Sequence, residues 1–141
     1  MDKLIFSQEF HFPVQIYYED TDFSGVVYHA NFLRYFERAR EEIIGAAELK
    51  QLWQEQQCGF AVYRCDMICH QGVEFADTLD VRSQVAMESQ YRSVWKQAIW
   101  RQGANRPAVT ATIEMVSLGP DRQLIPMPPQ VLARLQQPCQ G

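Results

Sequence analysis

The spacing of apolar residues changes once along the chain, and this change limits the possible folds more than any other feature. Apolar residues first recur at steps of three and four, which places them on one face of a helix: Phe32, Tyr35, Phe36, Ala39 and Ile43. From residue 61 onward, apolar or thiol residues alternate with other residues, as they do in strands. The spacing therefore predicts one long helix followed by a series of strands.

Turn-forming residues separate these strands by hairpin-length connections, which favours antiparallel pairing. We expect strands at 12–18, 61–69, 79–88, 94–100 and 109–115, and shorter helices at 48–56 and after the prolines of 126–129. One helix lying across one face of an antiparallel sheet is an α+β arrangement. The second face and the edge strands then need cover, which predicts a homo-oligomer, either a dimer or a dimer of dimers.

Composition narrows the class of protein. A chain of 141 residues, 47% of them hydrophobic, is expected to form a single domain over 1–141. The net charge of −4, without a run of lysine or arginine, argues against a nucleic-acid partner. No apolar run approaches the ~20 residues of a membrane helix, and the first ten residues lack the apolar core of a signal peptide. We therefore expect no membrane insertion and a cytoplasmic location.

The cysteines agree with that compartment. Cys65 and Cys69 lie four positions apart in an expected strand, about 13 Å from each other. This separation is too large for a disulfide, so free thiols are expected.

The segment Glu19-Asp20-Thr21-Asp22-Phe23-Ser24-Gly25, called here the acid loop, carries the main chemical interest. One hypothesis is a calcium loop, but position 12, where a bidentate glutamate belongs, is Asn31. A second is helix capping, which would account for one of the acids. A third is catalysis, because an ionised aspartate beside a helix start supplies both a carboxylate and free backbone amides.

The wider segment resembles the 4-hydroxybenzoyl-CoA thioesterase family, particularly the bacterial thioesterases encoded beside the Tol–Pal genes. The match rests on Tyr-Tyr-Glu-Asp-Thr-Asp, Gly-Val-Val-Tyr-His-Ala-Asn and Tyr-Phe-Glu-Arg-Ala-Arg, within residues 17–41. A looser resemblance extends to about residue 118 and includes Phe-Ala-Asp-Thr-Leu-Asp-Val at 75–81. The resemblance implies a hotdog fold, in which an antiparallel sheet wraps around one long central helix.

The resemblance also implies an activity and a site. It predicts an acyl-CoA thioesterase that needs neither a metal nor another cofactor, with Asp22 as the catalytic carboxylate. Tyr18 and His29 fall on the family's supporting residues, and the His29 backbone amide falls on its oxyanion donor. The sequence leaves open whether Asp22 is the nucleophile or a general base. The resemblance also implies a cleft shared between two subunits, with Asp22 of one facing the sheet of the other.

Two departures from the family pattern stand near the site. Phe32 replaces a tyrosine that close relatives usually carry, and residues 71–74 replace a proline-containing approach to Asp77. Two alternatives to the thioesterase are a hotdog hydratase or dehydratase acting on acyl thioesters and a non-catalytic acyl-thioester-binding scaffold. The hydratases lack the Asp-Thr-Asp-x-x-Gly loop, and a scaffold would tolerate replacement of Asp22.

Overall fold

The computed structural model describes residues 4–136, so both ends of the domain expected over 1–141 lie outside the described residues. Five strands and three α-helices form the chain, with two short 3-10 turns. The strands are β1 (Phe10–Gln15), β2 (Gly59–Cys69), β3 (Thr78–Met87), β4 (Arg92–Arg101) and β5 (Val109–Leu118). The helices are α1 (His29–Ile44), α2 (Ala46–Gln56) and α3 (Pro129–Leu135), and the 3-10 turns are η1 (Tyr18–Asp20) and η2 (Pro120–Arg122).

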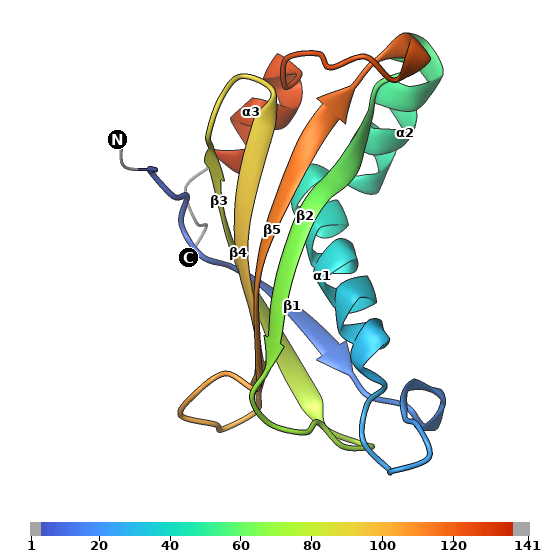
Figure 1. Cartoon of the computed structure of the whole chain (residues 1–141), viewed down its shortest axis with the longest axis vertical. Helices are drawn as coiled ribbons and strands as arrows, with labels where there is room; N and C mark the ends of the chain where they lie inside the picture. The colour runs from blue at the N-terminus through green and yellow to red at the C-terminus, as the bar shows by residue number, and fades with distance from the viewer. Residues whose placement is uncertain (1–3, 137–141) are drawn as a thin grey trace.

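All five strands form one antiparallel sheet in the order β1-β3-β4-β5-β2. Two hairpins, β3–β4 and β4–β5, build its centre, and β2 pairs with β5 although β3 follows it in the chain. α1 lies along one face of this curved sheet, and α2 continues above it at the upper end of the molecule (Figure 1). The expected arrangement of an antiparallel sheet around one long helix is therefore confirmed.

The buried face of α1 packs on the inward residues of the sheet. Four of the five residues expected on that face are buried, namely Phe32, Tyr35, Phe36 and Ala39. Ile44 is buried in place of Ile43, which is only partly buried. The sheet contributes the alternate residues of its strands, such as Val81, Trp95, Ile99 and Ile113. Burying this much apolar surface is the main favourable contribution to such a fold.

The long edge strand β2 departs from the expected alternation. Its pairing with β5 shifts at a bulge between Val62 and Arg64, where Tyr63 is the extra residue. Inward positions are therefore even-numbered before the bulge and odd-numbered after it, because an inserted residue reverses the phase of a strand. The prediction that Ala61 shares a face with Cys65 is wrong for this reason. Cys58, Cys65 and Cys69 are free thiols, as expected for the latter two.

The first strand and the helix boundaries also differ from expectation. β1 ends at Gln15, and Tyr18, the last residue expected in this strand, instead begins the turn η1. α1 begins at His29, two residues earlier than its apolar spacing indicates, and ends at Gly45, whose φ of 99° suits glycine. Within residues 4–136 no helix combines the length and the apolar character that crossing a membrane requires.

A buried polar contact joins α1 to the centre of the sheet. Gln97 of β4, which is 2% exposed, donates hydrogen bonds from Nε2 to the Phe36 carbonyl oxygen (3.1 Å) and to Ser83 Oγ (2.9 Å). Its Oε1 accepts a hydrogen bond of 2.9 Å from the guanidinium of Arg40, which is 6% exposed. Burial lowers the pKa of Arg40, which measures the cost of keeping this charge inside the protein.

We predict that Gln97→Met lowers the free energy of unfolding by about 2–3 kcal/mol, because Arg40 then keeps a buried charge without its acceptor. The double variant Arg40→Leu/Gln97→Met should recover part of this loss, since an apolar pair of similar volume leaves no unpaired charge. Urea denaturation at one fixed protein concentration measures both changes. Gln130→Met, at an exposed position of α3, is the matched control. A single variant as stable as the wild type would contradict the prediction.

Candidate active site

The acid loop folds as a small hairpin between η1 and α1. A bridge pairs Thr21 with Val27, and the Asp22 amide donates a hydrogen bond of 2.9 Å to the Val26 carbonyl oxygen. The turn is closed by the Gly25 amide, which donates to the Asp22 carbonyl oxygen at 3.1 Å. Gly25 has a φ of 85°, a conformation that glycine adopts without strain. The acid loop is therefore a compact turn, and it lies at the lower end of the molecule (Figure 1).

The Asp22 carboxylate is exposed and is held by Ser24. Its Oδ1 accepts hydrogen bonds from Ser24 Oγ (2.6 Å) and from the Ser24 amide (2.8 Å). These two bonds lower the pKa of Asp22 below its ordinary value, and the nearby His29 adds a smaller effect in the same direction. The Asp22 side chain is therefore a carboxylate at neutral pH.

His29 is the first residue of α1, which places its amide in the first turn of that helix. Amides in a first turn have no carbonyl partner inside the helix, so they point outward as free donors. The His29 side chain is exposed, and its ring packs edge-on against Tyr28 with 4.8 Å between the ring centroids. The structure thus brings the Asp22 carboxylate and the start of α1 to the same end of the molecule.

Tyr18 takes a different position. It belongs to η1, is 80% exposed, and lays its ring against Phe75 with 6.1 Å between the centroids. In the described part of the chain, its hydroxyl forms no hydrogen bond with the Asp22 carboxylate. The backbone of Tyr18 does support the acid loop, because its carbonyl oxygen accepts a hydrogen bond of 2.7 Å from Thr21 Oγ1.

The two other hypotheses for the acid loop can be compared with this geometry. The N-cap of α1 is Tyr28, and no side chain caps that helix, so the prediction of an acidic cap is wrong for α1. Asp20 instead accepts a hydrogen bond of 2.8 Å from the Tyr17 amide at the start of η1. Residues 4–136 contain no group of three His, Cys, Asp or Glu side chains able to hold a metal ion.

Two supports of the acid loop were not predicted from the sequence. The first is Ser24. The spacing Asp-x-Ser is typical of a turn in which the acid accepts a hydrogen bond from the residue two positions on. The second is the segment 71–74, where the family pattern is broken. Its buried Val73 accepts a hydrogen bond of 2.7 Å from the Val27 amide, and Glu74 forms a bridge with Val26. The altered segment therefore still holds the loop.

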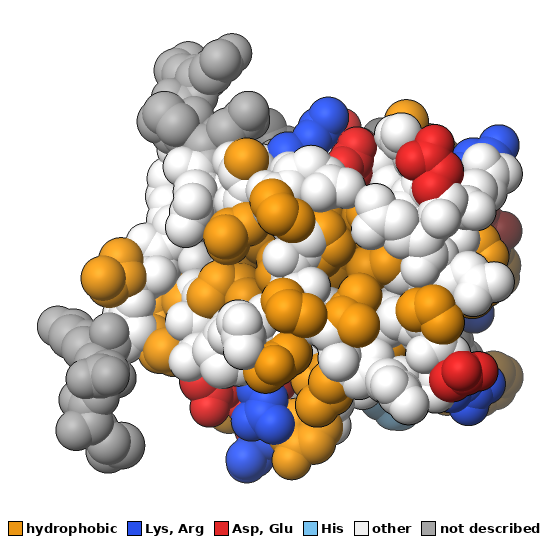
Figure 2. All heavy atoms as spheres, turned by 90° about the horizontal axis from the view of Figure 1, so that it is seen from above, with side chains coloured by type: hydrophobic (Ala, Val, Ile, Leu, Met, Phe, Trp, Pro, Cys, Tyr) orange, Lys and Arg blue, Asp and Glu red, His pale blue; other side chains and the backbone are white. Residues whose placement is uncertain are grey.

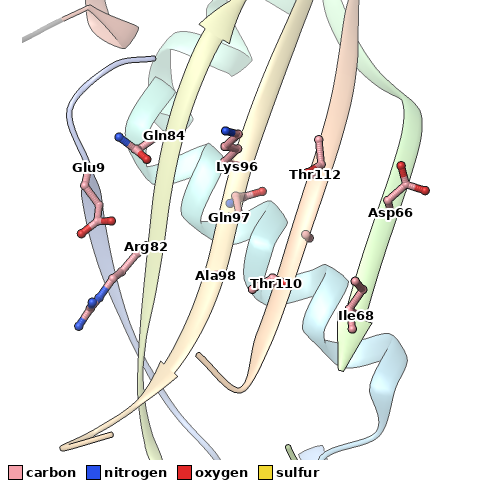
Figure 3. A pocket seen from close by; sticks show the side chains of 11 residues that line it. Glu9, Asp66, Ile68, Arg82, Gln84, Lys96, Gln97, Ala98, Thr110 and Thr112 are labelled. Carbon is pink, nitrogen blue, oxygen red and sulfur yellow. The ribbon is translucent and has the colours of Figure 1, made fainter. Parts of the chain in front are cut away.

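Phe32, the other departure from the family pattern, is 3% exposed and packs edge-on against Tyr35. A hollow of about 330 Å³ lies elsewhere, on the face of the sheet turned away from α1. Polar side chains from four strands line it, including Asp66, Arg82, Lys96 and Thr112 (Figure 3). Neither Asp22 nor His29 reaches this hollow, so it does not belong to the acid-loop site.

Comparison with known proteins agrees with the geometry. The model of the thioesterase-like superfamily matches residues 17–135. The acyl-CoA thioesterase YbgC of Haemophilus influenzae is 36% identical over 112 residues, which are 78% of this chain and 82% of that protein.

Solved structures show the same fold. The 1,4-dihydroxy-2-naphthoyl-CoA thioesterase from Synechocystis superposes with a TM-score of 0.83 at 21% identity, over 91% of this chain and 96% of that one. A 4-hydroxybenzoyl CoA thioesterase superposes with a TM-score of 0.82 at 15% identity, over 92% and 99% of the two chains. The expected hotdog fold is therefore confirmed. With a family match that spans nearly all of the described residues, this chain belongs to the thioesterase-like superfamily.

Proposed function

We propose that the protein is an acyl-CoA thioesterase, which hydrolyses an acyl thioester to a carboxylic acid and a free thiol. The observation that carries the proposal is the ionised Asp22 carboxylate beside the first turn of α1. Membership of the thioesterase-like superfamily and the similarity to the YbgC thioesterase support it. A thioester needs an attacking oxygen and a donor to the carbonyl oxygen, and this end of the molecule offers both.

Asp22 is proposed as the catalytic carboxylate in either of two ways. As a general base, it takes a proton from water, whose oxygen bonds to the thioester carbon. As a nucleophile, its own oxygen forms that bond, and water later cleaves the resulting anhydride. In both cases the C–S bond breaks and the sulfur leaves as the thiol after protonation. Ser24 keeps the carboxylate ionised for both routes.

His29 and Tyr18 are proposed as supporting residues. The backbone amide of His29 would donate to the oxyanion, because it lies in the first turn of α1, at the positive end, where amides have no partner within the helix. The imidazole of His29 would contribute local charge near Asp22. Tyr18, which contacts Phe75, would shape the entrance to the site through its exposed ring.

We predict that Asp22→Asn keeps the fold and lowers kcat by about 10²–10⁴-fold, because the amide can neither attack nor accept a proton. His29→Ala should cost less, since alanine retains the backbone amide. Thiol release from a panel of acyl-CoA substrates measures both effects. Glu19→Gln, which removes an exposed charge from the same loop, is the control. Wild-type turnover by a folded Asp22→Asn variant would refute the proposed mechanism.

A second prediction concerns pH. Activity requires ionised Asp22, so kcat/KM should fall as the pH drops through the pKa of that carboxyl. The Ser24 bonds lower this pKa, so the fall should lie on the acid side of the ordinary aspartate range. Ser24→Ala removes the hydroxyl donor, raises the pKa of Asp22 and should move the fall to higher pH. A pH profile of kcat/KM for both proteins, with an NMR titration of the Asp22 carboxyl, tests whether the variant loses activity at the higher pH. Identical profiles would contradict the prediction.

We further propose that the active protein is an oligomer built through β2. This strand spans 11 residues and, within residues 4–136, pairs only with β5, which leaves its outer edge open in that part of the chain. Val62, Tyr63 and Ile68 of this strand are more than half exposed. A long unprotected edge of this kind pairs readily with another strand. A second copy is the partner we propose, since symmetric dimers are the commonest assembly.

The direction of β2 indicates what such a dimer would join. β2 runs from the upper end of the molecule to the lower end, where the acid loop lies (Figure 1). Antiparallel pairing of two copies would therefore set the acid loop of one beside the upper end of the other. That end carries a cluster of hydrophobic side chains (Figure 2), and an apolar groove lined by Trp53, Phe60 and Val62 opens there.

We predict that specific activity falls when the protein is diluted until it dissociates, because one copy holds only part of the cleft. Mass photometry at each dilution gives the fraction of dimer or tetramer, and thiol release gives the activity. Asp22→Asn should dissociate over the same range, which separates assembly from chemistry. A folded monomer with full activity would exclude the shared cleft while leaving the role of Asp22 intact.

The compartment is a further part of the proposal. We propose that the protein works in the cytoplasm, where thiols stay reduced. Cys58, Cys65 and Cys69 are free in the structure, which supports this location. Cys65 and Cys69 are exposed as well, so an oxidising compartment would leave them open to reaction.

A further inference from the structure

Asp20, at the base of the acid loop, accepts hydrogen bonds through both carboxylate oxygens and through its carbonyl oxygen. Its Oδ2 accepts a hydrogen bond of 2.8 Å from the Tyr17 amide, and its Oδ1 accepts one of 3.2 Å from Asn31 Nδ2. Its carbonyl oxygen accepts a third, of 3.0 Å, from the Tyr28 amide. One residue thus ties together the chain before the loop, the chain after it and the first turn of α1.

Tyr35 lies under the same carboxylate. It stands four residues after Asn31 on α1, hence on the same face of the helix, and it is 1% exposed. Its hydroxyl has no hydrogen-bond partner of ordinary geometry among residues 4–136. Burial raises the pKa of Tyr35, and the adjacent Asp20 carboxylate raises it further, so the hydroxyl keeps its proton. The Tyr35 hydroxyl therefore lies near the Asp20 carboxylate without a hydrogen bond of ordinary geometry to it.

We propose, on the basis of the thioesterase function above, that Asp20 is a positioning residue for Asp22 and His29. Held by Asn31 and by the Tyr17 amide, it fixes the acid loop against the first turn of α1. Asp20 is separated from Asp22 by one residue. Its carbonyl oxygen accepts a hydrogen bond from the amide of Tyr28, the residue before His29. A shift of Asp20 therefore moves the attacking carboxylate and the oxyanion donor relative to each other, although Asp20 itself touches no substrate.

Asp20→Asn tests this role with little change of volume. The amide replaces one acceptor oxygen by an NH₂ group, which would face a donor from the Tyr17 amide or from Asn31. A displacement of about 1 Å in a reacting group can cost ~10²-fold in rate. We therefore expect kcat to fall about 10–100-fold, with KM close to that of the wild type.

Two comparisons define the control. Glu19→Gln removes the same charge from the neighbouring exposed residue, so its kcat should match the wild type. Asn31→Ala removes only one of the donors to Asp20, so its kcat should fall by less than that of Asp20→Asn. Circular dichroism and the melting temperature establish that each variant is folded at the assay temperature. If Asp20→Asn does not fold, Asn31→Ala carries the test, and unchanged kcat in that variant overturns the proposal.

A double-mutant cycle separates positioning from a general effect on stability. If Asp20 acts through Asp22, adding Asp20→Asn to Asp22→Asn should cost little further activity. An equal loss in both backgrounds, or wild-type kcat in a folded Asp20→Asn variant, would overturn the positioning role. The proposed function fails separately, if the wild-type protein releases no thiol from any acyl-CoA of the panel. The two failures therefore give different results in the same assay.

Discussion

The positions of the sheet and of the acid loop both depend on the buried face of α1. The sheet curves around that helix, and the strands contribute every second side chain to the common core. A buried polar contact lies at the centre of this core, where Gln97 bonds to Arg40 and to the Phe36 carbonyl. This contact sets where the helix lies along β4. An apolar contact alone tolerates small slides, whereas directed hydrogen bonds from buried groups do not. The start of α1 is thereby held at one end of the sheet.

This constraint also builds the candidate active site. Because α1 begins at His29, the acid loop must cross the lower end of the sheet to reach it. The loop is then held from two sides, by the segment around Val73 and by Asp20 at the base. Asp22 stays exposed while its neighbours are bonded, which is the arrangement that a reactive carboxylate needs. The stability of the helix and the geometry of the site are thus parts of one structure.

Local sequence patterns proved reliable where local physics decides. The helical steps from Phe32 onward place the core face of α1, since 3.6 residues per turn follows from backbone geometry alone. Alternation likewise locates β3, β4 and β5 to within a few residues. The same patterns misplace the end of β1 and the phase of β2. A 3-10 turn and a bulge leave no periodic trace, and each depends on what the neighbouring chain allows.

The sequence by itself therefore determined the helix, the antiparallel strands, the acid loop and the candidate Asp22. Only the tertiary structure decided that β2 pairs with β5, that Tyr18 turns toward Phe75 and that Asp20 bonds to Asn31. The physical reason is the separation along the chain between the residues that interact. Spacing along the chain reports which way a side chain faces, because it follows from dihedral angles. It does not report which partner that side chain meets, since partners distant in sequence are chosen by packing of the whole chain.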